Sequence, residues 1–399
     1  MDFGMIAVLD SITKTIVGNN NAGLFLRRFH REYGTKKLIT FLKNAVVENM
    51  VIGRYLRWKA ERNFGFSPGL QITFSPLSKC NLTCAGCYAD TDFYEEQLDP
   101  AIVSRVIKEG KRIGIRSFAI MGGEPFLWEG LFEVLEANPD VLITIVTNGT
   151  LIDDGMAKKL AEADNAFPFL SIDGFKERND AWRGEGVYDR VVNAMACLKR
   201  HRVLFGFSVT VTTDNFDEVS SAEFIDFLMG KGAYYGAYSP WGPAGRNPGF
   251  GYMLTDGQVE YLFERLGMLE KTRPIFFHKE GHFDGTSLNC GCGAGRVVNI
   301  LPDGSVEPCN AIHFSTGNVR SQSLLDILNH PFYKAIRNHA DSDSGHRCVG
   351  LFRSQETLDI AIHSGAKPTN PHVPHRMQIV SNYLKARSDA NNDAEKRKT

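Results

Sequence analysis

Short apolar segments alternate with amphipathic stretches between residues 70 and 270. The apolar segments read QITFSP, RSFAIMGG, VLITIVTNGT, FPFLSIDG, FGFSVTVTT and AYYGAYSP, and Gly, Pro, Asn or Asp bound them, as in buried parallel strands. Helical periodicity occurs near residues 98–113, 127–137, 152–163, 186–200, 218–230 and 255–270. The pattern predicts an α/β fold in which six β/α units curl into a partial (β/α)6 TIM-like barrel over residues 67–270.

The flanking regions have different patterns. Residues 1–66 read as a helical N-terminal extension. Residues 271–370 contain a predicted hairpin, in which PDG joins VVNIL to SVEPC, and predicted helices near 323–338 and 355–364. We interpret them as a small C-terminal hairpin-plus-helix domain. The charged segment 371–399 reads as a partly disordered tail.

Composition narrows the functional classes. The chain has 45 basic and 46 acidic side chains, so no general polyanion-binding surface and no nucleic-acid partner is expected. No apolar run reaches the roughly 18 residues of a membrane span. The N-terminus lacks a basic start before an apolar core, so we expect no secretory signal and a cytoplasmic protein.

The eight cysteines are clustered. Without a secretory signal, a disulfide framework is not favoured. Cys80, Cys84 and Cys87 follow the first predicted strand with the spacing C-x3-C-x2-C, whereas Cys197 lies in an amphipathic helix and reads as a small buried hydrophobe. The motifs SKCNLTCAGCY, GGEP, TNGT and SIDG all fall at the carboxyl ends of strands, where barrels of this kind place their chemistry.

Three thiolates on one short loop suit three corners of an iron–sulfur cubane. The fourth iron is then open to a small molecule that binds through an amine and a carboxylate. The alternatives are a zinc site and a fully ligated electron-transfer cluster. Structural zinc usually takes four protein ligands, and no fourth Cys or His lies near this loop. The spacing therefore favours a [4Fe–4S] cluster.

With the other strand-end motifs, the cysteine loop resembles the signature of the radical S-adenosylmethionine (SAM) superfamily over residues 70–240. The matching residues beyond the three cysteines are Tyr88, Gly122, Gly123, Glu124, Pro125, Thr147, Asn148, Gly149, Ser171, Asp173 and Arg183. The resemblance implies that the cluster cleaves SAM reductively to a 5′-deoxyadenosyl radical, which abstracts hydrogen from a substrate. It also implies a reducing partner such as flavodoxin or ferredoxin.

The same resemblance implies roles for individual residues. Glu124 and the GGEP backbone face the methionine amine of SAM, and Tyr88 lies near its adenine. Arg183 and Ser171 bind the methionine carboxylate, the arginine as a two-pronged donor. Asp173 lies close by in sequence. Two alternatives stay open: Asp173 and Gly174 form a simple turn, or Arg183 makes a surface ion pair.

The segment from Cys292 through the predicted hairpin to Cys309 resembles the start of the SPASM auxiliary-cluster domain. The fuller domain carries about seven cysteines, whereas this region has four: Cys290, Cys292, Cys309 and Cys348. This favours one auxiliary [4Fe–4S] cluster, closer to the shorter twitch arrangement. One iron stays open if Cys290 does not bind. A structural zinc site on the same residues is the alternative, and His313 and His346 are possible substitutes.

The N-terminal extension bears on the substrate. Residues 1–64 hold eleven Lys or Arg against five Asp or Glu. Apolar positions recur there at helical spacing: Leu38, Phe41, Leu42, Ala45, Val46, Ile52 and Leu56. Such a helix either lies on an anionic membrane as a peripheral contact or packs its apolar face on the barrel.

Three functions remain open. A membrane-associated lipid or isoprenoid substrate would need a long apolar cavity, which YYGAYSPWGP and PIFFH are suited to line. The alternatives are a peptide- or protein-modifying enzyme, the commoner use of auxiliary-cluster relatives, and a non-enzymatic iron–sulfur electron carrier, which has no use for GGEP or SIDG. Tyr234, Tyr235, Tyr238 and Cys290 are candidate hydrogen donors by position alone.

Overall fold

The computed structural model describes residues 20–87, 94–243, 250–279, 296–341, 348, 354–370, 379 and 382. A nine-stranded sheet runs through it in the order β7-β6-β5-β4-β3-β2-β1-β8-β9. The strands are β1 (Gln71–Phe74), β2 (Ser117–Ile120), β3 (Ile143–Thr147), β4 (Ala166–Ser171), β5 (Gly206–Val211), β6 (Tyr235–Pro240), β7 (Phe276–Lys279), β8 (Val297–Ile300) and β9 (Val306–Glu307). Pairing is parallel from β7 to β8, and β9 returns antiparallel to β8.

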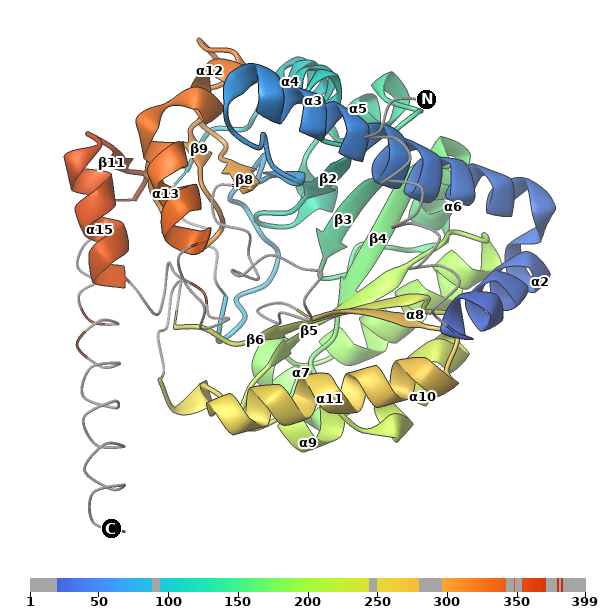
Figure 1. The fold of residues 1–399 in the computed structure, drawn as a ribbon. Coiled ribbons are helices and arrows are strands. Elements are labelled where there is room, and N and C mark those ends of the chain that lie inside the picture. The colour runs from blue at the N-terminus through green and yellow to red at the C-terminus, as the bar shows by residue number, and fades with distance from the viewer. Residues whose placement is uncertain are drawn as a thin grey trace.

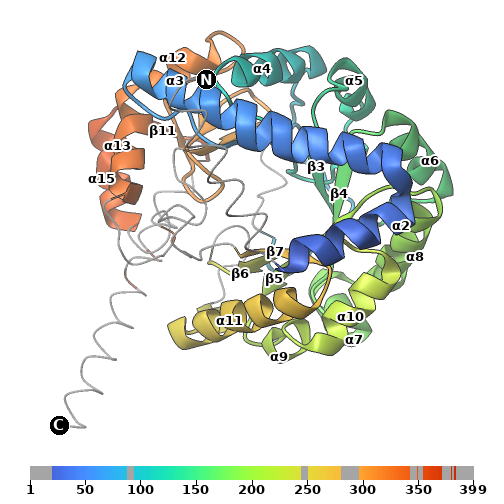
Figure 2. The same cartoon turned by 45° about the vertical axis from the view of Figure 1, so that its right-hand side comes forward.

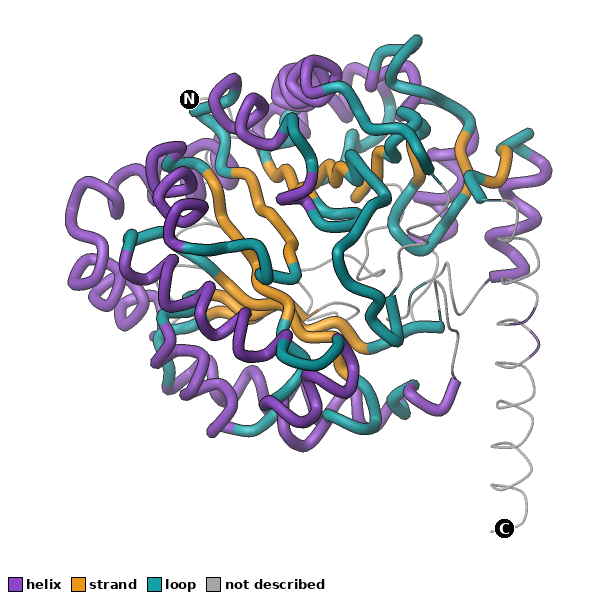
Figure 3. The backbone as a smooth tube through the Cα atoms, turned by 180° about the vertical axis from the view of Figure 1, so that it is seen from behind, coloured by secondary structure: helices purple, strands orange, loops and turns teal. Residues whose placement is uncertain are grey.

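Helices follow the strands and ring the sheet (Figures 1 and 3). They are α4 (Pro100–Arg112), α5 (Leu131–Ala137), α6 (Asp154–Ala163), α7 (Lys176–Arg183), α8 (Val187–Arg200), α9 (Phe216–Val219), α10 (Ala222–Lys231) and α11 (Asp256–Thr272), with short 3-10 helices η2 (Pro125–Leu127) and η3 (Phe250–Tyr252). The predicted α/β partial barrel is confirmed. Cys197 is buried in α8, as its place in an amphipathic helix predicted.

Local sequence signals set where these helices begin. The Asp153 carboxylate accepts a hydrogen bond from the backbone N–H of Met156 at the start of α6. Asp99 caps α4 in the same way, and Pro100 occupies the first helical position, where no backbone N–H is needed. Short loops lead from β3 to α6, from β4 to α7 and from β5 to α9, whereas the cysteine motif lies on the long segment between β1 and α4.

The sheet extends beyond the predicted barrel boundary at residue 270. The segment FFHK forms β7 on the edge of β6, with Tyr235 in register with Phe276. The predicted PDG hairpin is present as β8 and β9, and β8 pairs in parallel with β1. The C-terminal region therefore shares a continuous sheet with the barrel. A short parallel strand such as β7 lacks a distinctive pattern, because its apolar run is no longer than that of a buried loop.

The remaining C-terminal elements follow the hairpin, and the first of their helices packs beside α4. They are α12 (Leu324–Asn329), α13 (Pro331–Asp341), α15 (Ser354–His363) and the two-stranded pair of β10 (Phe314–Ser315) with β11 (Lys367–Pro368). The helices predicted near 323–338 and 355–364 are confirmed, and Pro331 separates the first into α12 and α13. The predicted tail, except residues 379 and 382, lies outside the described residues.

The N-terminal extension is helical from residue 20 onward, and residues 1–19 lie outside the described part. It comprises α2 (Asn20–Leu42), a π-helix η1 (Lys43–Gly53) and α3 (Arg54–Phe64), with a break at Gly34, whose φ is +81°. Figure 2 shows the blue helical segment crossing the ring of barrel helices. No helix in the described part of the chain is long and apolar enough to cross a membrane.

Hydrogen bonds attach this extension to the amino ends of the strands. The Tyr33 hydroxyl donates to the carbonyl of Val203 (3.3 Å), just before β5. Arg28 donates to the carbonyl of Ala233 (2.9 Å), before β6, and Arg57 to that of Gly114 (2.7 Å), before β2. The extension therefore covers the barrel end opposite the strand-end motifs.

Aromatic packing fixes α2 in place. Phe25, Phe29 and Tyr33 surround the ring of Tyr234, with centroid distances of 5.4 to 5.6 Å, and Phe25 also meets Phe276 at 5.0 Å. Burying each such ring contributes about 2–3 kcal/mol. Of the apolar positions predicted for the extension, Leu38 and Phe41 pack against this cluster, so packing on the barrel accounts for these two.

Candidate active site at the carboxyl ends of the strands

The three-cysteine loop follows β1 and lies at the catalytic edge predicted for it. Cys80, Cys84 and Cys87 are all partly buried. The backbone N–H of Ala85 donates to the carbonyl of Trp182 at the end of α7 (3.0 Å), and the N–H of Cys87 to the carbonyl of Cys84 (3.4 Å). These bonds shape the loop through the chain's own backbone.

GGEP packs directly beneath this loop. The N–H groups of Gly123 and Glu124 donate to the carbonyls of Leu77 and Lys79, both at 3.0 Å. A Cβ on Gly123 would overlap the carbonyl oxygen of Lys79, and one on Gly122, whose φ is +114°, would lie 2.7 Å from that of Leu77. The two glycines therefore allow the GGEP backbone to approach the cysteine loop closely.

The side chain of Glu124 points into the protein. It is 1% exposed. Its Oε1 accepts from the Thr147 hydroxyl (2.6 Å) and the N–H of Phe126 (3.1 Å), and its Oε2 from the N–H of Asn148 (2.9 Å). Burial raises the pKa of Glu124, and the three hydrogen bonds oppose that rise. The carboxylate assigned by resemblance to the SAM amine joins the ends of β2 and β3 here.

Asn148 connects the end of β3 to the first cysteine. Its Nδ2 donates to Asn81 Oδ1 (2.8 Å) and lies 3.8 Å from Cys80 Sγ, while the N–H of Leu82 lies 3.5 Å from the same sulfur. Burial raises the pKa of the Cys80 and Cys84 thiols. A metal-bound thiolate would find N–H donors already in place at Cys80, so this donor set fits a cluster ligand.

Asp173 and Arg183 form a buried pair beside the second cysteine. Arg183 Nε lies 2.7 Å from Asp173 Oδ2, in a contact that lacks hydrogen-bond alignment. Burial alone lowers the pKa of Arg183, but the charges of Asp173 and of the Cys84 and Cys87 sulfurs hold it above its usual value. Arg183 therefore makes a buried ion pair rather than a surface one, and Asp173 does more than form a turn, because it is the partner in that pair.

Ser171 ends β4, and its hydroxyl lies 3.2 Å from that of Ser208 on β5. Its expected role and that of Arg183 toward the SAM carboxylate stay predictions. Pro125 is buried at the start of η2. Tyr88, Cys290, Cys292 and His346 lie outside the described residues.

Sequence reasoning missed an aromatic group on the cysteine loop. Trp182 and Trp241 both pack against Gly86, and Tyr252 meets both rings edge-on, at 5.1 and 5.8 Å between centroids. Trp182 directly precedes Arg183, and Trp241 directly follows β6. Their positions next to strand-end motifs are the feature of the sequence that could have identified these two tryptophans.

Two of the candidate tyrosine hydrogen donors have structural roles instead. The Tyr234 hydroxyl donates to Glu32 (2.7 Å) at the amino end of the barrel, and that of Tyr238 to the carbonyl of Val219 (2.8 Å) in the helix layer. Side chains alternate along a strand, so Tyr235 points to the other face from both. Burial raises the pKa of Tyr235 to about 12.

Near the predicted auxiliary cluster, Cys309 is buried just after β9, and the N–H of Ala311 lies 3.4 Å from its sulfur. Glu307 accepts from Asn299 (3.0 Å) across the β8–β9 hairpin, and Asn299 in turn accepts from the hydroxyl of Ser75 (3.0 Å), directly after β1 of the barrel. His313, a possible substitute for a cysteine ligand, lies 3.1 Å from Glu307, and this contact would compete with metal binding. Cys348 is partly buried.

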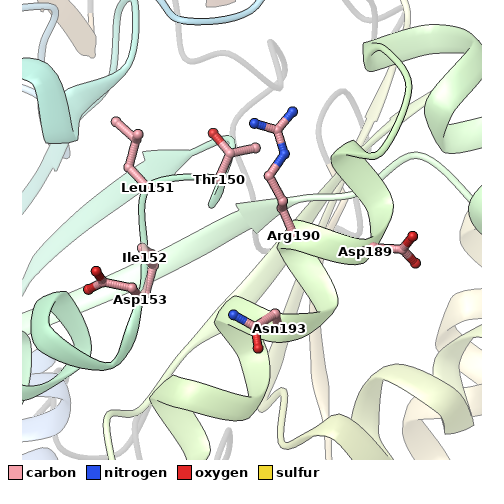
Figure 4. Close-up of a pocket in the computed structure, with 7 residues that line it drawn as sticks. All are labelled: Thr150, Leu151, Ile152, Asp153, Asp189, Arg190 and Asn193. Atoms are coloured by element: carbon pink, nitrogen blue, oxygen red, sulfur yellow. The ribbon is translucent and has the colours of Figure 1, made fainter.

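A separate open pocket lies beside the site rather than in it. Its lining residues come from the loop after β3 and from α8 (Figure 4): Thr150, Leu151, Ile152, Asp153, Asp189, Arg190 and Asn193. Thr150 is the link to the site, because its hydroxyl donates to Asn148 Oδ1 (2.6 Å). Both signs of charge line this pocket, so it does not resemble a selective anion site.

Comparisons with known proteins agree with this geometry. Residues 74–225 match the radical SAM superfamily, and residues 290–349 match the SPASM iron–sulfur cluster-binding domain. The mycofactocin maturase MftC of Mycolicibacterium smegmatis is 31% identical over 64% of this chain and 69% of that protein. The Fe-coproporphyrin III synthase of Methanosarcina barkeri is 30% identical over 64% and 72%.

The fold has solved counterparts. Streptococcus suis SuiB bound to S-adenosylmethionine superposes with a TM-score of 0.61 at 17% identity, over 84% of this chain and 89% of that one. The superfamily implies a [4Fe–4S] cluster and SAM, and the SPASM domain implies auxiliary iron–sulfur binding. The chain is therefore a radical SAM superfamily enzyme with a C-terminal SPASM domain.

Proposed function

We propose that this radical SAM enzyme modifies a peptide or protein by hydrogen abstraction. The main support is that the aromatic residues predicted to line a lipid cavity pack against other parts of the protein instead. Tyr234 packs among α2 aromatics, and Tyr238 packs edge-on against Phe277 at 5.6 Å. Phe276 contacts Phe25. The long apolar cavity that a lipid chain needs therefore loses most of its expected lining.

Relatives support the same class of substrate. MftC is named a maturase, and SuiB is also solved bound to the precursor peptide SuiA. The Fe-coproporphyrin III synthase acts on a different class of molecule, so the family alone does not select a peptide.

The chain's own residues have defined tasks in this proposal. When bound, the cluster and SAM supply a 5′-deoxyadenosyl radical. Cys80, Cys84 and Cys87 hold the cluster, while GGEP and Asn148 fix the loop that carries them. Asp173 holds Arg183 beside Cys84. A flavodoxin- or ferredoxin-type protein delivers the electron.

Deuterium transfer tests the substrate class. The source organism is grown in deuterated medium and separated into a peptide and protein fraction and a lipid extract. Each fraction is incubated anaerobically with reduced enzyme and unlabelled SAM, and deuterium in 5′-deoxyadenosine is measured by mass spectrometry. We expect label from the peptide and protein fraction, and its loss after protease treatment. Label from the lipid extract alone would establish the lipid reading instead.

A second proposal concerns location: the enzyme works in the cytoplasm, docked peripherally on an anionic membrane. The observation behind it is an outer strip on the N-terminal extension, formed by Lys36, Ile39, Lys43, Val47 and Arg54, all exposed. Ile39 is 62% exposed and Val47 46%. Exposed cations and apolar side chains that alternate along the successive helical elements α2, η1 and α3 suit a lipid headgroup region.

The strip lies at the amino end of the barrel, so docking would turn the catalytic edge away from the membrane. This orientation is compatible with a soluble peptide substrate. Flotation with phosphatidylglycerol vesicles compares wild type, K43E/R54E and the control K108E/K158E, which reverses exposed charges on the barrel helices. We expect only K43E/R54E to lose binding. Equal flotation of all three, or none, contradicts docking through the strip.

A further inference from the structure

An unpaired donor lies beside the cysteine loop. Trp241 follows β6, and its backbone N–H donates to the carbonyl of Val211 (2.8 Å). Its side chain is 5% exposed, and Tyr252 packs edge-on against it. The indole Nε1–H is buried and has no hydrogen-bond partner among the residues that the structure describes. Backbone and ring contacts thus fix a donor whose partner is missing.

The position of Gly86 shows where this donor lies. A Cβ built on Gly86 would lie 2.9 Å from Trp241 Nε1. Gly86 stands between Cys84 and Cys87, so the indole nitrogen lies against the C-x2-C part of the loop. Trp182 packs against the same glycine, but through its ring carbons Cζ2 and Cη2. Two tryptophans therefore flank one glycine, and only Trp241 brings its nitrogen to it.

A buried N–H without a partner is costly, and native proteins rarely leave one. Tryptophan only donates, so the partner must be an acceptor. A bound cluster brings sulfur acceptors to this loop, both its sulfides and the thiolates of Cys84 and Cys87. Hydrogen bonds to such sulfurs are among the factors that set the reduction potential of an iron–sulfur cluster.

We propose that Trp241 is a positioning residue whose indole N–H donates a hydrogen bond to a sulfur of the catalytic cluster and makes the cluster easier to reduce. Reduction adds negative charge to the cluster, so the bond is stronger in the reduced state. Trp241 thereby favours the electron transfer on which SAM cleavage depends. The proposal is independent of the substrate class.

The matched variants are Trp241→Phe and Trp182→Phe. Each variant removes the same atoms from an indole ring that packs against Gly86, but only Trp241→Phe removes the buried N–H donor. The potential of the catalytic cluster is measured by redox titration with electron paramagnetic resonance, without SAM. We expect Trp241→Phe to reduce the equilibrium constant for reduction by up to about tenfold, or about 59 mV for a one-electron couple. Trp182→Phe should stay at the wild-type value.

A second measurement identifies the bond itself. Electron–nuclear double resonance of the reduced cluster in deuterated buffer should show an exchangeable deuteron that Trp241→Phe loses and Trp182→Phe keeps. Equal potentials in all three proteins would overturn the proposal. So would weakened SAM binding in Trp241→Phe with an unchanged potential, because the donor would then serve SAM. Equal shifts in both variants would show altered packing only.

Discussion

Arg183 Nε lies 2.7 Å from Asp173 Oδ2, and both side chains are largely buried beside Cys84. This pair joins the end of α7 to the loop after β4. In that loop, Asp173 Oδ1 also accepts a hydrogen bond from the backbone N–H of Thr210 on β5 (2.7 Å). The carbonyl of Trp182, next to Arg183, holds the cysteine loop. The pair therefore fixes the element on which the cluster loop rests.

Asp173→Asn should destabilise the protein strongly. It leaves the Arg183 charge buried without a counter-charge, which costs about 3–5 kcal/mol of unfolding free energy. The matched control is Asp189→Asn, which breaks the exposed pair with Lys176 and should leave the unfolding midpoint unchanged. Urea unfolding followed by circular dichroism measures both. Equal midpoints for the two variants would show that the buried pair does not stabilise the fold.

Glu124→Gln should lower stability, because both carboxylate oxygens accept from donors and an amide nitrogen would face one of them. The expected loss is about 1–3 kcal/mol of unfolding free energy. Thr147→Val removes one donor to Glu124 and the acceptor of the Gly149 N–H, and should cost about 1–2 kcal/mol. Urea unfolding and SAM-binding titrations separate the two roles. Unchanged stability with weakened SAM binding would show that Glu124 serves the methionine amine, as the resemblance predicts, rather than the fold.

Gly123→Ala should displace the cysteine loop, because the new Cβ would overlap the carbonyl oxygen of Lys79, directly before Cys80. We expect loss of most catalytic-cluster iron after anaerobic reconstitution, about four irons per chain. Gly257→Ala in the first turn of α11 has open space around the added Cβ and serves as the control. Full iron content in Gly123→Ala would mean that the loop tolerates the shift.

Cys309→Ala should lower the iron content from about eight to about four per chain, because it removes an auxiliary-cluster ligand. Cys197→Ala is the matched control, since both sulfurs are buried but Cys197 packs within the helix layer. Anaerobic iron and sulfide analysis gives the answer. Full iron content in Cys309→Ala, or zinc in the wild-type protein, would contradict an auxiliary cluster that depends on this residue.

The sequence predicted the barrel well because each β/α unit repeats one local pattern of buried strand and amphipathic helix. Strand β7 was not predicted, because its short apolar run forms a strand only by pairing with the edge of β6. The direct pairing of β8 with β1 was equally hidden, because residues more than two hundred positions apart meet there.

In the site, motif spacing identified the cysteine loop and its neighbours but not what each side chain contacts. Glu124 turns toward Thr147, and Asp173 pairs with Arg183, because the loops fold back on themselves. The position of Trp241 against Gly86 joins β6 to the loop after β1. Such contacts form only when the barrel brings distant segments together, so no local sequence pattern predicts them.

SAM cleavage requires that the three cysteines leave one iron of the catalytic cluster open for SAM. The most direct measurement is electron–nuclear double resonance of the reduced enzyme with SAM carrying ¹⁵N in its methionine amine. We expect a nitrogen coupling to the catalytic cluster that is absent from the variant with Cys80, Cys84 and Cys87 all changed to alanine. A wild-type cluster that shows no such coupling at saturating SAM would contradict it.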